Sequence, residues 1–254
     1  MSETKRGLGG IKTARRVFDV LELAQNTNGI TRSDVSEELD VARSTAHDYL
    51  TTLEDVGYLV REDEQFYLGL RFLQYGAAAQ NRLDYLDVII PTLKQYAEKS
   101  GEALWHVAEE SGDGIYVIEK KSPQAAQMTG GKVGEKVPLH ASAAGKVILA
   151  DQPDARLEEL DLPALTPHTT TDREILRKEI HALREMGVAF NDAEHMPGLR
   201  GVACPIRQDD SLIGAVGVGG PAARIRDEFF SKELPTLLRE AANEIELNLC
   251  EPNF

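Results

Sequence analysis

Polar side chains that can hydrogen-bond to nucleic acid gather in residues 41–53. Ala46, Leu50 and Leu53 recur at spacings of three and four, which places them on one face of a helix. The remaining faces carry arginine, serine, threonine and histidine, whose side chains bond base edges and phosphates. A recognition helix places such residues near its N-terminal end in the major groove. The residues of this segment predicted to contact DNA are Arg43, Ser44, Thr45, His47 and Thr51.

The flanking sequence predicts the elements that would hold this helix. Thr31 and Asp34 form a capping-box-like start for a preceding helix, and Gly57 ends the recognition helix. Apolar periodicity predicts three helices, at 11–25, from residue 31, and at 42–56. Strand-forming runs at 58–61 and 66–68, separated by polar residues, predict a hairpin. Residues 1–70 therefore have the outline of a winged helix-turn-helix.

Arginines on the earlier helices extend the predicted DNA surface. Arg15, Arg16 and Arg32 lie where backbone phosphates would run, and phosphate contacts fix the register of a protein on DNA. A solvated helix face is the alternative explanation, since Ser, Thr and Arg are ordinary surface residues. The preceding helix and the following hairpin together favour the DNA-binding interpretation.

A second, larger domain follows a predicted linker helix at 71–83 and occupies residues 84–254. Strands are predicted near 104–108, 115–119, 188–190, 202–206 and 212–218. Helices are predicted at 84–99, 140–150, 172–186 and 227–249. The last two strands are joined by a short polar turn, which indicates an antiparallel sheet flanked by helices and an α+β fold class.

Several blocks of the sequence resemble the IclR family of transcriptional regulators. The N-terminal blocks are ARSTAHDYLTTLEDVGYL and FYLGLR, and the later ones are VPLHASAAGKVILA, NDAEHMPGLRGVACPI and GAVGVGGP. The resemblance implies a winged helix-turn-helix followed by a GAF-like effector domain, a homodimer or homotetramer on a palindromic operator of double-stranded DNA, and control of catabolic genes. One departure is Asp48, where family members often carry arginine; the predicted wing tip is also acidic.

The resemblance further implies an effector pocket between the helix after the LHA segment and the sheet. Matching the blocks assigns to it Ala143, Ala144, Asn191, Leu199, Gly201, Gly217 and Gly219, with the loop near Met128 as a cover. Family members often have acidic, thiol and hydroxyl side chains where this chain has Asn191 and three glycines. We therefore expect a roomy pocket for a sugar acid or an aromatic carboxylate, oriented by Asn191 and backbone amides. Close packing within a strand is the alternative explanation for the glycines.

The net charge of -14 is unusual for a nucleic-acid binder. The first 83 residues carry 10 Lys and Arg against 13 Asp and Glu, so the predicted DNA-binding domain is itself slightly acidic. One explanation is a winged helix that serves as a protein-interaction module beside a GAF-like sensor. The other is adaptation to a salt-rich cytoplasm, which the abundant Asp and the excess of Arg over Lys favour.

No catalytic, cofactor or metal site is predicted. Cys204 and Cys250 have no metal-ligand spacing, the six histidines are scattered, and no GxSxG elbow or phosphate loop occurs. The polar first ten residues contain no apolar signal segment, and no apolar run approaches the ~18 residues of a membrane span. A cytoplasmic protein without a membrane partner is expected.

Overall fold

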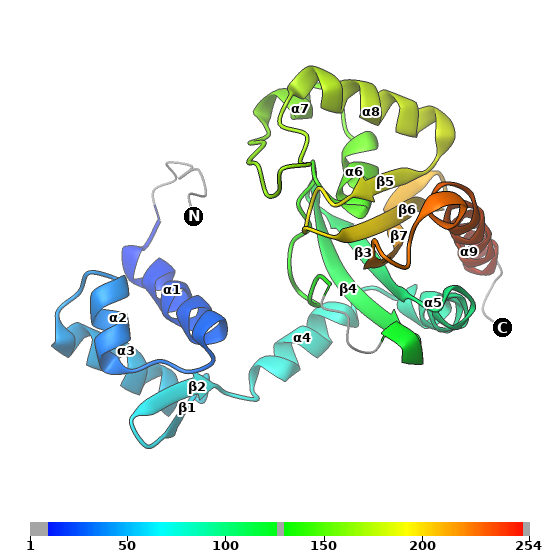
Figure 1. The fold of residues 1–254 in the computed structure, drawn as a ribbon. Helices are drawn as coiled ribbons and strands as arrows, with labels where there is room; N and C mark the ends of the chain where they lie inside the picture. The colour runs from blue at the N-terminus through cyan, green and yellow to red at the C-terminus, as the bar shows by residue number, and fades with distance from the viewer. Residues whose placement is uncertain (1–9, 126–129, 251–254) are drawn as a thin grey trace. The chain divides into compact units, whose positions relative to one another are not determined.

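The computed structural model describes residues 10–125 and 130–250, which belong to two compact units, Met1–Leu83 and Asp84–Phe254. The first unit contains α1 (Lys12–Thr27), α2 (Arg32–Glu38), α3 (Arg43–Asp55), the strands β1 (Leu59–Glu62) and β2 (Gln65–Leu68), and α4 (Phe72–Gln80) (Figure 1). The three helices and the hairpin confirm the predicted winged helix-turn-helix.

Local capping and a small core fix the first unit. The backbone N–H of Thr31 donates to Asp34 Oδ2 at 2.7 Å and the N–H of Asp34 donates to Thr31 Oγ1 at 3.3 Å, so the predicted capping box is present. The recognition-helix residues Ala46, Leu50 and Leu53 are buried, as their spacing predicts. They pack in one core with Val20, Ala24, Ile30, Val35, Leu59 and Phe66.

The hairpin is tighter than predicted. Glu62 pairs directly with Gln65, which leaves a turn of only Asp63 and Glu64 instead of four residues. Asp63 has a φ of 53°, in the left-handed region that aspartate tolerates better than most side chains. An isolated bridge between Ile30 and Phe66 fastens the hairpin to the connection before α2.

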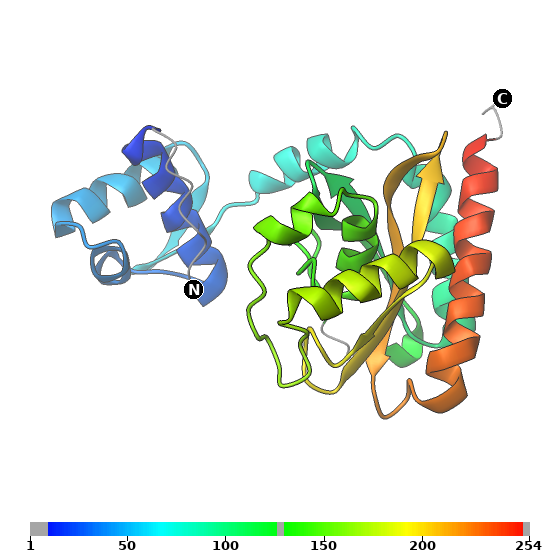
Figure 2. The ribbon, with the colours of Figure 1, turned by 90° about the horizontal axis from the view of Figure 1, so that it is seen from above.

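The second unit is built on an antiparallel sheet with the strand order β4-β3-β7-β6-β5. The strands are β3 (Ala103–Glu110), β4 (Asp113–Lys121), β5 (Ala189–Asp192), β6 (Leu199–Gln208) and β7 (Ser211–Pro221). Helices α5 (Leu86–Ser100) and α9 (Leu234–Cys250) cover one face, and α6 (Ala143–Ala150), α7 (Ala155–Glu159) and α8 (Arg173–Met186) lie over the other (Figure 2). The α+β class predicted from the sequence is confirmed.

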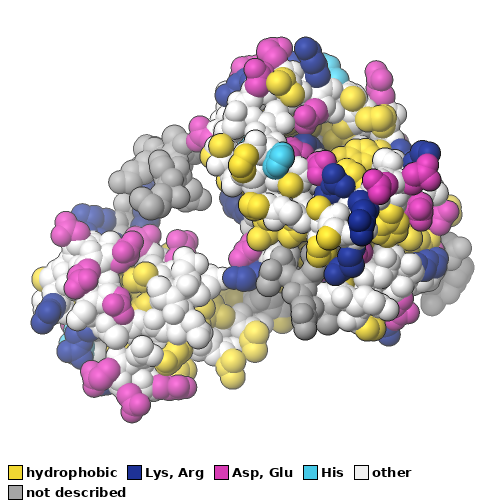
Figure 3. Space-filling view, in the orientation of Figure 1, with side chains coloured by type: hydrophobic (Ala, Val, Ile, Leu, Met, Phe, Trp, Pro, Cys, Tyr) yellow, Lys and Arg dark blue, Asp and Glu magenta, His cyan; other side chains and the backbone are white. Residues whose placement is uncertain are grey.

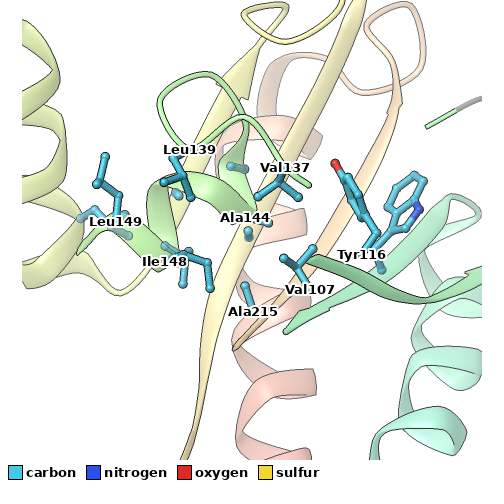
Figure 4. Packing of buried hydrophobic residues seen from close by; sticks show 14 of the residues in the cluster. Val107, Tyr116, Val137, Leu139, Ala144, Ile148, Leu149 and Ala215 are labelled. Atoms are coloured by element: carbon cyan, nitrogen blue, oxygen red, sulfur yellow. The ribbon is translucent and has the colours of Figure 1, made fainter. Parts of the chain in front are cut away.

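Helix α6 packs closely on the sheet. Ala144 and Ile148 face Val107 and Ala215 in the buried cluster that joins the helix to the strands (Figure 4). Gly145 permits a second close approach, that of residues 138–139 to the first turn of α6, because a Cβ there would lie 2.4 Å from the carbonyl oxygen of Pro138 and 2.6 Å from Leu139 Cα. A larger residue would push the first turn of α6 away from the segment that precedes it.

Three helical segments differ from the sequence prediction. The helix predicted from residue 140 begins at Ala143, because Ser142 caps it by accepting a hydrogen bond from the N–H of Gly145 at 2.9 Å. Residues 227–249 are not one α-helix, since the π-helical turn Phe229–Glu233 precedes α9. The short helix α7 was not predicted, and it offers too few residues for a periodic pattern.

Candidate functional site

The first unit presents an open groove between the starts of two helices and the turn of the hairpin. Its lining residues are Thr31, Arg32, Ser33, Arg43, Ser44, His47, Glu64 and Phe66. Arg32, Arg43, Ser44 and His47 are all exposed, and all four were predicted to contact DNA. The groove therefore gathers donors from α2 and from the N-terminal half of α3, the part of a recognition helix that reaches base edges.

The other predicted DNA contacts lie outside this groove. Arg15 is exposed on α1, whereas Arg16 lines a different groove together with Asp19, Glu22 and Glu38. Thr45 is half-buried beside apolar side chains. The Thr51 hydroxyl donates to the carbonyl oxygen of His47 at 2.9 Å, so its proton is used within the helix.

Acidic side chains gather at the tip of the hairpin, where a winged helix often approaches a phosphate backbone. Glu62, Asp63 and Glu64 are exposed there, and Figure 3 shows acidic side chains at this end of the first unit. The Arg61 guanidinium forms an ion pair with Glu64 at 3.2 Å. Glu64 also lines the groove with Arg43, which brings a negative charge to the edge of the basic surface.

The second unit contains a small cavity between α6 and the sheet. All seven described residues of the predicted effector pocket line it: Ala143, Ala144, Asn191, Leu199, Gly201, Gly217 and Gly219. Met128, the predicted cover, lies outside the described residues. Helix α6 thus supplies one wall, strands β6 and β7 supply a second, and the start of the β5–β6 connection supplies a third.

Aromatic side chains that the sequence reasoning missed fill much of the space that the glycines leave. Trp105 and Tyr116 line the cavity with their ring centroids 6.4 Å apart, and Trp105 Nε1 donates to the carbonyl oxygen of Gly131 at 3.2 Å. A Cβ on Gly131 would lie 2.0 Å from the Tyr116 ring. The cavity measures about 60 Å³, whereas a cavity of about 150 Å³ binds benzene. Trp105 and Tyr116 form an aromatic wall of the cavity, and with this wall in place the expectation of a roomy pocket is wrong.

The backbone of the cavity glycines is also less available than predicted. Gly217 pairs with Trp105 on one side and Ala203 on the other, and Gly219 pairs with Ala103 and Gly201. Because β7 is the central strand, its N–H and C=O groups are used in the two ladders. These glycines offer a flat apolar surface, and the polar contacts of the cavity must come from elsewhere.

Polar groups of the cavity come from the start of α6 and from the end of β5. The N–H groups of Ala143 and Ala144 lie in the first turn of α6, where no intrahelical acceptor exists. The Asn191 side-chain oxygen accepts from the N–H of Glu194 at 2.9 Å and from that of His195 at 3.4 Å. Its amide nitrogen makes no hydrogen bond within the described part of the chain, so two donors remain for a ligand. First-turn amides of a helix are a favourable place for an anion.

A buried ion pair joins these two polar walls. The Lys146 ammonium on α6 donates to both carboxylate oxygens of Glu194, at 2.7 and 2.8 Å, and forms an ion pair with Glu179 at 3.0 Å. The Lys146 and Glu194 side chains are only 7% and 11% exposed. Burial raises the pKa of the Glu194 carboxyl, and the ammonium of Lys146 opposes that shift. The pair therefore ties the turn after β5, which the Asn191 side chain holds, to the helix that starts at the cavity.

His195 and Arg200 also line the cavity, although the sequence reasoning assigned them no role. Arg200 donates to both oxygens of Asp192, at 2.6 and 3.1 Å, and lies over the Phe230 ring. Burial lowers the pKa of His195. Both residues fall inside the block that carries the family resemblance, but only the fold shows that they face the cavity.

Comparison with known proteins identifies the family of the chain. The family described as Bacterial transcriptional regulator IclR C-terminal matches residues 77–247, and the IclR helix-turn-helix domain matches residues 13–63. The chain belongs to the IclR family. It is a DNA-binding transcriptional regulator with an N-terminal helix-turn-helix and a C-terminal effector-binding domain.

Similar members cover nearly the whole chain. The protein named "Probable HTH-type transcriptional regulator ArcR" of Halobacterium salinarum is 30% identical over 94% of both chains. The HTH-type transcriptional repressor AllR of Escherichia coli K12 is 28% identical over 93% of this chain and 89% of its own. An IclR homolog of Microbacterium hydrocarbonoxydans, crystallised with 4-hydroxybenzoate, is 26% identical with a TM-score of 0.79, over 94% of this chain and 99% of its own.

Two further observations concern metal sites and membrane spans in the described part of the chain. No group of three or more His, Cys, Asp or Glu side chains there is arranged to hold a metal ion. None of the helices in residues 10–125 and 130–250 is long and apolar enough to cross a membrane.

The buried ion pair of Lys146 with Glu194 leads to a prediction about the stability of the second unit. Lys146→Met should lower the free energy of unfolding by roughly 3–5 kcal/mol, because two carboxylates lose their shared cation in a buried site. Denaturant unfolding measures the change. Lys232→Met is the matched control, since its ion pair with Glu228 joins side chains that are 70% and 74% exposed, and the control should change stability by less than about 0.5 kcal/mol. Equal small effects of both substitutions would show that the buried pair does not stabilise the domain.

Proposed function

We propose that the groove of the first unit reads a palindromic operator in double-stranded DNA. The single observation that carries this proposal is that Arg32, Arg43, Ser44 and His47 share one exposed groove at the start of α3. Arg43, Ser44 and His47 contact base edges, and Arg32 contacts the phosphate backbone. The remaining predicted contacts, Arg15, Arg16, Thr45 and Thr51, have weaker support, because Arg16 lies among carboxylates and the Thr51 hydroxyl is used within the helix.

The regulator acts as a homodimer or homotetramer in this proposal. A second groove on the first unit is lined by apolar and aromatic side chains from α1, α3 and α4, among them Val17, Phe18, Val56, Phe72 and Tyr75. Phe18 is 64% exposed and Leu73 on α4 is 69% exposed. Apolar surface of this extent marks an interaction site. A second copy seated there would hold two recognition helices at a fixed spacing, which a palindromic operator requires.

Adaptation to a salt-rich cytoplasm reconciles the acidic chain with DNA binding. The net charge of -14 and the acidic hairpin tip weaken attraction to phosphates at low salt. At molar salt the Debye length falls to about 3 Å, so these charges no longer repel DNA over a distance. The similarity to the ArcR protein of Halobacterium salinarum supports this proposal.

The effector is a small carboxylate that binds in the cavity of the second unit. Occupancy of this cavity by the effector regulates catabolic genes. Trp105 and Tyr116 offer aromatic faces, and the first turn of α6 and the Asn191 amide offer donors to the carboxylate. The complex of the Microbacterium homolog with 4-hydroxybenzoate supports an aromatic carboxylate. A sugar acid is the second candidate, but its hydroxyls need more polar partners than the cavity walls offer. Entry of an aromatic ring into about 60 Å³ requires the aromatic wall to move. We propose no catalytic role and no cofactor.

The operator assignment predicts the effect of removing one side chain. Arg43→Ala should lower affinity for the operator about tenfold or more, because a lost bidentate base contact costs roughly 1–3 kcal/mol. Gel shifts with the DNA upstream of the gene, from low to molar KCl, measure the loss. Arg226→Ala, an exposed arginine of the second unit, is the control and should leave affinity unchanged. Unaltered binding by Arg43→Ala would reject this helix as the reader, and no binding to any fragment at any salt would favour the protein-interaction module.

The effector assignment predicts a charge-sensitive response at one position. Asn191→Asp keeps the oxygen that accepts from Glu194 and His195 but replaces two N–H donors by a negative oxygen. Affinity for a carboxylate effector should fall tenfold or more, while operator binding without effector persists, because a hydrogen bond to a charged group contributes roughly 1.5–3 kcal/mol. Isothermal titration calorimetry against benzoates, aldonates, glyoxylate and pyruvate measures the change. Asn243→Asp, on the exposed side of α9, controls for the added charge. An Asn191→Asp variant with wild-type effector affinity would contradict the assignment.

A further inference from the structure

Among the described residues that line the cavity, three carry titratable side chains: Tyr116, His195 and Arg200. Burial raises the pKa of Tyr116 to about 12, so its hydroxyl stays neutral. The Arg200 guanidinium is bound to both oxygens of Asp192 and to the carbonyl oxygen of Ile225. Its charge is therefore already neutralised. His195 is the remaining group in the cavity wall whose charge can change near neutral pH.

The imidazole of His195 is placed to respond to a ligand. The residue lies next to Glu194 on the turn after β5, and its backbone N–H donates to the side-chain oxygen of Asn191, a residue of β5, at 3.4 Å. Its ring makes no hydrogen bond with any described residue and is half-buried at the cavity. The ring nitrogens are thus free to meet an incoming group, while the backbone that carries them is held.

Burial is the largest influence on the charge of His195 in the absence of an anion. Burial and His140 lower the pKa of His195, whereas the Glu135 carboxylate raises it. His140 is itself kept neutral by burial and by Lys146, and its ring contacts the carbonyl oxygen of Pro163. Behind the turn, Lys146 faces the two carboxylates of Glu179 and Glu194, so this cluster adds no net positive charge. The imidazole is therefore neutral at pH 7.

A carboxylate between apolar walls requires compensation by positive charge, since burying an unpaired charge is costly. The first turn of α6 supplies only the partial charge of its N–H groups. An opposite charge close to an imidazole favours its protonated form. An anion in this cavity and a proton on His195 must therefore stabilise each other.

We infer that the effector's carboxylate and a proton bind this cavity together: the neutral imidazole of His195 takes up one proton from solvent as the anion enters. This inference rests on the proposed effector site. No covalent bond changes, and the imidazolium and carboxylate form an ion pair. The regulator then responds to effector concentration and to pH through one residue, with tighter effector binding at lower pH.

The direction of the pH effect follows from linkage. When the pH is above the pKa that His195 has in the complex, the imidazole stays neutral and the affinity for the effector does not depend on proton uptake. As pH falls below that value toward the lower pKa of the free protein, affinity rises, by up to about tenfold per pH unit. Below the pKa of the free protein the imidazole is already charged, and affinity becomes independent of pH.

Calorimetry of the full-length protein tests the inference. Benzoate, 4-hydroxybenzoate, gluconate, glyoxylate and pyruvate are titrated in buffers of different ionisation enthalpy, from about pH 8 to about pH 6, where histidine changes charge. For each carboxylate that binds, uptake approaching one proton and tighter binding at lower pH are expected. For benzoate, the neutral benzamide should show neither effect. His195→Gln should remove the proton uptake, and His168→Gln, at an exposed histidine of the same unit, should retain it.

If the His195→Gln variant does not fold, a spectroscopic measurement on the wild type still tests the inference. Nuclear magnetic resonance titration of the histidine rings should show one pKa that rises when the carboxylate is added. Binding without proton uptake, or uptake that persists in His195→Gln, overturns this inference and leaves the proposed effector site intact. Absence of saturable binding by every carboxylate of the panel overturns the proposed effector site, and this inference with it.

Discussion

The buried ammonium of Lys146 is the constraint on which the second unit's cavity depends. A lysine on α6 with a side chain only 7% exposed is tolerable because Glu194 and Glu179 surround it. Thr166 and Thr169 hold the same turn by donating to the carbonyl oxygens of Ala193 and Glu194, at 2.7 and 2.6 Å. The polar contacts fix where Asn191 and His195 lie relative to the start of α6. A hydrogen-bonded network of this kind specifies one arrangement of the turn.

The opposite side of the cavity is shaped by the contrast between small glycines and large aromatic side chains. Glycines of β7 and of residues 130–131 leave room that Trp105 and Tyr116 occupy, with close contacts to the backbone. The cavity thus has polar groups at the start of α6 and at the end of β5, and a further wall made of two aromatic rings. Such a division suits a planar anion, whose carboxylate meets the helix start while its apolar part lies against the rings. Displacement of the rings is the structural change that effector entry would produce.

Local patterns allowed most of the fold to be predicted from the sequence. Periodicity placed α3 correctly because Ala46, Leu50 and Leu53 are neighbours on one helix. The cavity residues on α6, β6 and β7 were reached through the family resemblance. The contact of Trp105 with Gly131, and the commitment of the Gly217 backbone to two ladders, depend on strands far apart in the chain. His195 was missed for the same reason, since no local spacing distinguishes it from the other histidines.

The central claim is that occupancy of this cavity controls DNA binding. Its most direct test is operator affinity with and without the carboxylate that binds most tightly, in the wild type and in Ala144→Leu, which fills the cavity from α6. In the wild type the effector should change operator affinity roughly 5- to 150-fold, the usual range of coupling between two sites. In the variant, effector-free affinity should be retained and the response lost. An Ala144→Leu variant that still responds with wild-type effector affinity would contradict the account.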